Sequence, residues 1–314
     1  MVVTVTDQTG SKMKVLVTGA TGFVGTTLVP HLLQSGHRVI VVTRNAERLQ
    51  QCSWSGSVDV LVGDLAAAEV CQRATAAVDA VIHLADLAHL RTTGDGHRQS
   101  LVRLQQLAEA ASAAGVARFI YISSCKAKYP AHSSYGFCKK AAEDYLLRMK
   151  SPMEVVCLRP GIIYGNNMRN NLQTLLRILQ RRNLPLFPSA QGPISMISVD
   201  DCARAITTAL TAPALREDVW DLNDGETYTL DSLVSMIRQH YGLALPAWRL
   251  PPLLLWCLCA LCEPLSRCGL LPLGLATCRV LYREAYPPDA RFAEASGFVA
   301  SSRFLHFLRQ QTPP

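Results

Sequence analysis

Tyr135 and Lys139 are four residues apart in the string Tyr-Gly-Phe-Cys-Lys, which opens a predicted helix. Positions i and i+4 share one face of a helix, so the phenol and the ammonium can address the same ligand. A tyrosine at its ordinary pKa of about 10 is a poor base near neutral pH, but nearby positive charge favours the phenolate. Ser124 ends a predicted strand that begins at Phe119, and its hydroxyl could polarise a substrate oxygen, with Ser123 as the alternative. This set predicts proton transfer to or from an alcohol or carbonyl oxygen.

A glycine-rich turn precedes these residues in the chain. The apolar run 13–17 reads as a buried strand and stops at Gly19, Gly22 and Gly25, which are spaced three apart. An amphipathic helix is predicted over 23–34, and a second apolar strand over 38–42, as a strand-helix-strand unit requires. Because glycine has no Cβ, backbone N–H groups at such a turn can approach a pyrophosphate at the positive end of the helix. The pattern predicts a dinucleotide site.

The residues after the second predicted strand bear on the choice of cofactor. An acidic residue there would hold the ribose 2′-OH of NAD, whereas an arginine can pair with the 2′-phosphate of NADP. The chain has Thr43-Arg44-Asn45 and no acid at this point. Arg44 therefore favours NADP(H) over NAD(H), and a solvated surface arginine is the alternative interpretation.

Three strings together resemble the extended, epimerase-like branch of the short-chain dehydrogenase/reductase superfamily. They are the turn at 19–25, the Tyr-x-x-x-Lys motif downstream of a strand-end serine, and 159–165, which reads Arg-Pro-Gly-Ile-Ile-Tyr-Gly. The resemblance implies an α/β fold with a doubly wound parallel (Rossmann) sheet and a smaller C-terminal substrate lobe. The implied parts are a flexible tail at 1–12, a cofactor domain at 13–165 and 193–226, and a lobe at 166–192 and 227–314.

The resemblance also implies roles for single residues. Tyr135 would shuttle a proton, Lys139 would tune it, and Ser124 would hold the substrate oxygen. Only eleven positions separate Ser124 from Tyr135, fewer than extended members usually have. The resemblance therefore does not predict which residues cover the substrate site. The residues expected at the cofactor are Gly19, Thr21, Gly22, Phe23, Val24, Gly25, Arg44, Asp64, Leu65, Leu84, Ala85, Tyr135, Lys139, Pro160, Ile162 and Ile163.

Two features bear on the substrate. Sugar-nucleotide enzymes of the branch commonly place an arginine before the return to the main sheet, where this chain has Pro193-Ile194-Ser195. The run 253–262 carries no charge, and it is shorter than the twenty or so apolar residues of a membrane span. The chain looks most like the 3β-hydroxysteroid dehydrogenase and dihydroflavonol reductase groups. We therefore expect hydride transfer between NADP(H) or NAD(H) and a secondary alcohol or ketone on a hydrophobic, sterol-like ring. A nucleotide-sugar epimerase or 4-ketoreductase is the alternative enzyme, and a non-catalytic nucleotide-binding subunit is a third reading.

The amino-acid composition bears on which partners the protein can bind and on its cellular compartment. The net charge is +7, but the Lys and Arg residues are scattered, which argues against nucleic acid as a partner. The chain has eleven cysteines, and residues 1–12 are polar and lack the apolar region of a secretory signal peptide. These two features predict a reducing, cytoplasmic compartment. Cys259 and Cys262 form a lone pair without a second knuckle, so no metal is expected. Peripheral membrane contact through 250–275, in which case the protein would be membrane-associated, and a homodimer are further expectations.

Overall fold

The computed structural model describes residues 12–85, 94–181, 186–216, 218–246, 248–267, 278, 282 and 284–311. Residues 1–11 of the predicted tail and 268–275 of the apolar stretch lie outside this part. The chain divides into two compact units. One consists of Met1–Ile122, Asp144–Cys157 and Ala203–Asp218, and the other of Ser123–Glu143, Leu158–Cys202 and Val219–Pro314.

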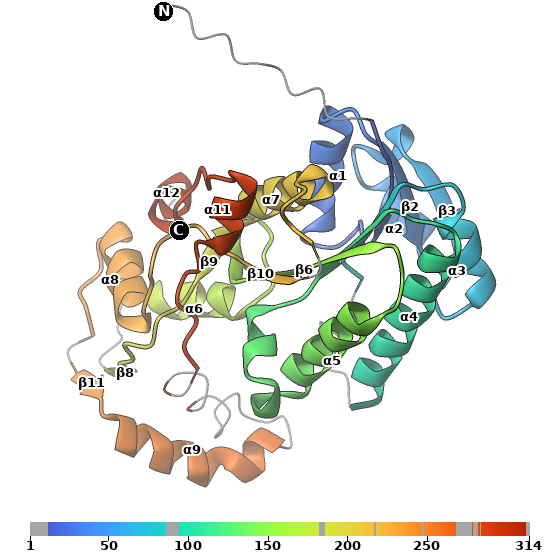
Figure 1. Ribbon diagram of the computed structural model, residues 1–314. Helices are drawn as coiled ribbons and strands as arrows, with labels where there is room; N and C mark the ends of the chain where they lie inside the picture. Colours follow the sequence, from blue (N-terminus) through green and yellow to red (C-terminus); the bar gives the residue numbers. More distant parts are fainter. Residues whose placement is uncertain are drawn as a thin grey trace, which may run out of the picture. The chain divides into compact units, whose positions relative to one another are not determined.

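A seven-stranded sheet with the order β10-β6-β5-β4-β1-β2-β3 confirms the predicted doubly wound α/β fold (Figure 1). The strands from β5 through β4, β1 and β2 to β3 pair in parallel. The order reverses between β1 and β4, and in folds of this class ligands bind at the carboxyl ends of such strands. The strands are β1 (Lys14–Thr18), β2 (Arg38–Thr43), β3 (Asp59–Val62), β4 (Ala80–His83), β5 (Arg118–Ile122), β6 (Glu154–Pro160) and β10 (Asp218–Leu222).

The first unit folds around the continuous apolar strands. Val15, Leu16 and Val17 of β1 are fully buried, as expected for a parallel strand covered on both faces. Gly36 and Gly115 follow the ends of helices in left-handed conformation, with φ of 81° and 74°, which a residue with a Cβ rarely adopts. The helices that alternate with the strands are α1 (Gly25–Gln34), α2 (Ala46–Gln50), α3 (Ala68–Thr75), α4 (Gly94–Ala113), α5 (Ser134–Arg148) and α7 (Val199–Thr211).

The second unit adds two small parallel sheets and its own helices. One sheet pairs β7 (Ile162–Tyr164) with β9 (Met196–Ser198), and the other pairs β8 (Leu186–Pro188) with β11 (Trp248–Leu250). No helix among the described residues has the length and apolar character needed to cross a bilayer. The further helices are α6 (Asn171–Leu179), α8 (Leu230–His240), α9 (Pro252–Arg267), α11 (Arg291–Ser296) and α12 (Phe304–Gln310).

The start of helix α7 involves two polar residues, Ser198 and Asp201. The helix begins at Val199, and Ser198 caps it by accepting a hydrogen bond from the Asp201 N–H at 3.0 Å. The Asp201 carboxylate is instead fully buried and accepts hydrogen bonds from Ser301 and Ser302. It joins the start of α7 to a segment one hundred residues later in the chain.

Candidate active site

The glycine turn after β1 is built around two close backbone approaches. Gly19 has a φ of +72°, and a Cβ there would lie 2.7 Å from the backbone nitrogen of Ala85. A Cβ on Gly25 would lie 2.5 Å from the Gly19 carbonyl oxygen. The Gly22 N–H closes the turn by donating to that same carbonyl at 2.9 Å. Only glycine fits at Gly19 and Gly25, so the turn brings the end of β1, the start of α1 and the residues after β4 into contact.

The turn also offers unused hydrogen-bond donors. Within the described part of the chain, the N–H groups of Phe23 and Val24 donate to no acceptor. A Cβ on Gly22 would lie 3.1 Å from the Gly19 carbonyl oxygen, which is a tight contact, but it would meet no other atom within 4 Å. Helix α1 starts directly after these donors, and the positive end of its dipole adds to their attraction for an anion. The turn fits the pyrophosphate of a dinucleotide.

Arg44 lies in a small charge cluster. Its guanidinium is 3.8 Å from the Asp64 carboxylate, which also accepts two hydrogen bonds from Arg103 of α4, at 3.0 and 3.2 Å. Partial burial raises the pKa of Asp64, but the Ala66 N–H and the two arginines outweigh this effect and hold the pKa below its usual value. Two permanent cations thus stand around one ionised carboxylate. The sequence analysis missed Arg103 because spacing along α4 does not show which strand end it reaches.

The residues after β4 pack tightly on the end of β1. The Leu84 N–H donates to the Thr18 carbonyl at 3.2 Å, and the Ala85 N–H to the Thr18 hydroxyl at 3.3 Å. His83 is buried and hydrogen-bonded to the same hydroxyl at 2.8 Å, so it is a structural residue at the strand end. Leu65 is also buried. These contacts hold Ala85 against Gly19.

The second unit holds the residues expected to do the chemistry. The Lys139 ammonium is 5.7 Å from the centre of the Tyr135 ring, and the Lys139 side chain is buried. Ser124 follows β5 and caps a short turn by accepting from the Lys126 N–H at 3.3 Å. A Cβ on Gly136 would lie 2.5 Å from the Lys126 carbonyl oxygen, so the start of α5 packs directly against the turn that Ser124 begins. The geometry therefore places Ser124 and Tyr135 on two elements in contact.

Ser123 has a different role from Ser124. Its hydroxyl is buried and donates to the Glu143 carboxylate at 2.5 Å, whereas the Ser124 side chain is partly exposed. Burial raises the pKa of the neighbouring Cys125 thiol to about 11, so this cysteine is neutral near pH 7. Ser124 is left as the hydroxyl that can meet a substrate.

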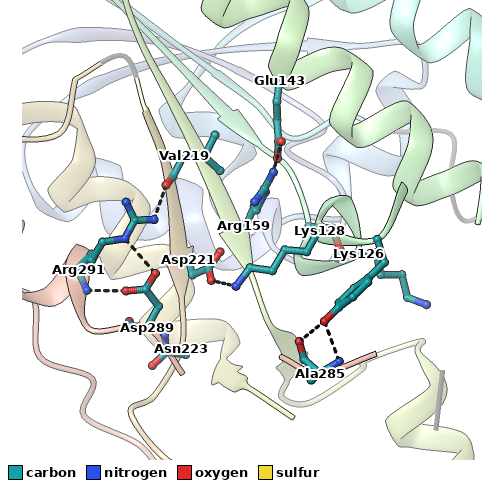
Figure 2. A network of polar contacts seen from close by, with 12 residues as sticks. Lys126, Lys128, Glu143, Arg159, Val219, Asp221, Asn223, Ala285, Asp289 and Arg291 are labelled. Carbon is teal, nitrogen blue, oxygen red and sulfur yellow. Dashed lines mark hydrogen bonds and ion pairs between the residues drawn. The ribbon is translucent and has the colours of Figure 1, made fainter. Parts of the chain in front are cut away.

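Glu143 is a buried acid that the sequence analysis did not identify. It is fully buried on α5, four residues after Lys139, and its carboxylate accepts two hydrogen bonds from Arg159, at 2.7 and 2.5 Å (Figure 2). Together with the bond from Ser123, the carboxylate joins α5, β6 and the residue that follows β5. The signal in the sequence was a glutamate in helical register with the Tyr-x-x-x-Lys motif.

The short segment between Ser124 and Tyr135 is held by contacts with residues that lie far from it in the sequence. Lys128 pairs with Asp221 of β10, and the Tyr129 hydroxyl donates to the Ala285 carbonyl at 3.0 Å (Figure 2). His132 lies 3.2 Å from the carboxylate of Glu284. The segment between Ser124 and Tyr135 is therefore held in place by residues that come much later in the chain.

The string 159–165 contacts two other segments of the second unit. The Gly161 N–H donates to Leu222 of β10, and the Ile162 N–H to Ser195, both at 2.9 Å. Pro160 is buried, whereas Ile162 and Ile163 keep partly exposed side chains that could contact a ligand.

Comparisons with known proteins identify the family of the chain. A family model described as "NAD dependent epimerase/dehydratase family" matches residues 15–223. The chain belongs to this family. It is thus an NAD(P)-dependent enzyme of the extended short-chain dehydrogenase/reductase type.

Relatives within the epimerase/dehydratase family differ in what they act on. UDP-glucose 4-epimerase of Vibrio cholerae is 30% identical over 269 residues, covering 77% of this chain and 79% of the relative. Ceramide reductase of Caulobacter vibrioides is 33% identical over 223 residues, covering 70% and 69%. The crystal structure of gox2253 has a TM-score of 0.75 at 22% identity, covering 92% of this chain and 94% of that one, and this likeness shows the fold alone.

Proposed function

We propose that this enzyme transfers a hydride reversibly between NADP(H) and a secondary alcohol or ketone on an apolar substrate, with a sterol-like ring as the specific expectation. The observation that carries the chemistry is the Tyr135 and Lys139 pair on α5, packed against the turn that Ser124 begins. When bound, the cofactor supplies or accepts the hydride at the substrate carbon.

The side chains of the second unit would handle the oxygen and its proton. In the reducing direction, the Ser124 hydroxyl donates a hydrogen bond to the carbonyl oxygen, and the Tyr135 phenol gives that oxygen its proton. In the oxidising direction, the Tyr135 phenolate takes the proton of the alcohol. The Lys139 ammonium favours the phenolate in either direction because opposite charge nearby stabilises the ionised form.

The preference for NADP(H) rests on the charge cluster after β2. Arg44 and Arg103 together carry two positive charges against the single charge of Asp64. The surplus charge would favour a 2′-phosphate. The glycine turn would hold the pyrophosphate, with the N–H groups of Phe23 and Val24 as donors.

The apolar substrate is supported by the residues before β9. Ile194 pairs with Tyr228 through two backbone hydrogen bonds of 2.7 and 3.0 Å, and Ser195 is buried. No cation stands at 193–195, where sugar-nucleotide enzymes commonly use an arginine. The relative named ceramide reductase points to a lipid-class substrate, whereas the relative named UDP-glucose 4-epimerase supports the second candidate, a nucleotide-sugar epimerase.

One assay separates the two candidates. Purified enzyme is offered hydroxysteroids, long-chain ketones and UDP-hexoses, each with NADP+ or NADPH, and absorbance at the nicotinamide band is followed alongside product analysis. Tyr135→Phe is the blank, and Tyr145→Phe, on the same helix, is the matched control because its hydroxyl is engaged by Glu109. Turnover of steroids or long-chain ketones, lost in Tyr135→Phe alone, supports the proposal. Interconversion of UDP-hexoses without net change in NADPH would replace it with the epimerase.

A further inference from the structure

Helix α9 presents a continuous apolar face to solvent. The residues at this face recur with helical spacing from the first turn to the fourth, and none of them is polar or charged. The leucines at its two ends, Leu253 and Leu261, are 77% and 79% exposed. The exposed residues of the face are Leu253, Leu254, Cys257, Leu258, Ala260, Leu261 and Pro264.

The opposite face of α9 is already occupied. Leu255 and Cys259 are buried in a small core with Leu250 and Cys278, and Trp256 and Tyr282 pack against that core. The helix is therefore anchored to the second unit by its own apolar side chains. The buried face of α9 already has its packing partners in this small core. The exposed leucines therefore form a second apolar surface, on the other side of the helix.

Such a face is unusual in a protein exposed only to water. A surface helix normally turns polar residues outward, and a contiguous exposed apolar patch marks an interaction site. Trp248, in β11 just before α9, adds an aromatic ring that is 72% exposed. Tryptophan favours membrane interfaces, where one side of the ring is apolar and the other is wet.

Two observations select a lipid surface as the occupant. The face consists of seven exposed residues on one helix and is about 18 Å long, whereas each side of a stable protein–protein interface has about 20–30 residues. The sequence from 248 to 283 carries four arginines and one glutamate. Arg249 pairs with Asp231, and the other three arginines still outnumber the glutamate, which suits anionic lipid headgroups. We propose that α9 lies in the plane of an anionic bilayer surface with Leu253, Leu254, Leu258 and Leu261 inserted. This proposal goes beyond the hydride-transfer function and stands without it.

Vesicle flotation of the full chain tests the proposal. Wild type is expected to float with vesicles of phosphatidylcholine and phosphatidylglycerol at three to one, more weakly with phosphatidylcholine alone, and less at high salt. Leu261→Glu should weaken partition at least ten-fold, because it places a charge in the inserted face. Leu253→Glu is a second variant at the other end of α9.

Val299→Glu is the matched control, because Val299 is 73% exposed and lies outside α9. All variants should keep wild-type thermal unfolding and NADPH binding, which separates loss of docking from loss of the fold or of the cofactor site. Equal flotation of wild type and Leu261→Glu would overturn the proposal. So would failure of wild type to float, or a wild-type dimer that Leu261→Glu converts to monomer, which would assign the face to a second copy.

Discussion

Replacing Arg44 with alanine should reduce the preference for NADPH over NADH. A charge-assisted hydrogen bond contributes about 1.5–3 kcal/mol when it is shielded from water. The Arg44 side chain is 59% exposed and shares the Asp64 carboxylate with Arg103, so we expect a contribution at or below the lower end of that range, about 1–2 kcal/mol. This corresponds to a roughly 5–30-fold rise in the Kd for NADPH. The Kd for NADH should stay within about two-fold, because the removed contact needs the 2′-phosphate.

Fluorescence titration of both cofactors with wild type and Arg44→Ala measures this difference. Arg48→Ala is the control, because Arg48 is an exposed arginine on α2 and its side chain has no ion pair with Asp64. Arg103→Ala should weaken NADPH as well, and it should also raise the pKa of Asp64 by removing its closest cation. If wild type binds NADH as tightly as NADPH, or if Arg44→Ala weakens both cofactors equally, Arg44 is a surface charge and the reasoning is wrong.

Three further outcomes follow from single residues. Gly22→Asp should abolish cofactor binding, measured by calorimetry, while the thermal unfolding temperature stays near that of wild type. Gly56→Asp, at a glycine with no atom within 4 Å of its Cβ position, should change neither cofactor binding nor thermal unfolding. Ser124→Ala should lower kcat about 100-fold without changing stability. Ser123→Ala should instead lower the free energy of unfolding by about 1–2 kcal/mol, because the Ser123 hydroxyl donates a hydrogen bond to the buried Glu143 carboxylate. Burial raises the pKa of Asp201, but the hydrogen bonds from Ser301, Ser302 and Ser198 outweigh this effect and lower the pKa. The stabilisation that Asp201 provides is therefore present above about pH 4 and lost as pH falls through the pKa of the folded state. Asp201→Asn should cost about 2–3 kcal/mol at pH 7 in urea unfolding and less at pH 3.

The fold was predictable because its signals are local. A buried strand, a glycine turn and a helix occupy 14–34 in an order that few folds use, and the helix ends at Gly36 and Gly115 follow from the freedom of glycine at positive φ. The charge cluster around Asp64 was only half predictable. Arg44 follows a strand, but Arg103 reaches Asp64 across thirty-nine residues, and no spacing rule reports such a contact.

The apolar stretch near 250 shows a second limit of sequence reasoning. Hydropathy identified an uncharged run, but burial depends on which side of a helix has neighbours. Leu255 and Cys259 are core residues, and Leu254 and Leu258, each one position away, are exposed. Since all four are apolar, their periodicity carries no information about direction.

The contacts around Glu143 and Tyr129 explain how a shortened segment can still position its serine. Here the start of the segment is held by the hydrogen bond from Ser123 to Glu143, which also pairs with Arg159, and its middle by the Tyr129 bonds to the Ala285 backbone. A buried carboxylate with three donors costs much to disrupt, because removing one partner leaves a desolvated charge. We therefore expect Tyr129→Phe, which removes both bonds to the Ala285 backbone, and Glu143→Gln, which weakens the bonds from Arg159 and Ser123, to alter the reaction through the position of Ser124.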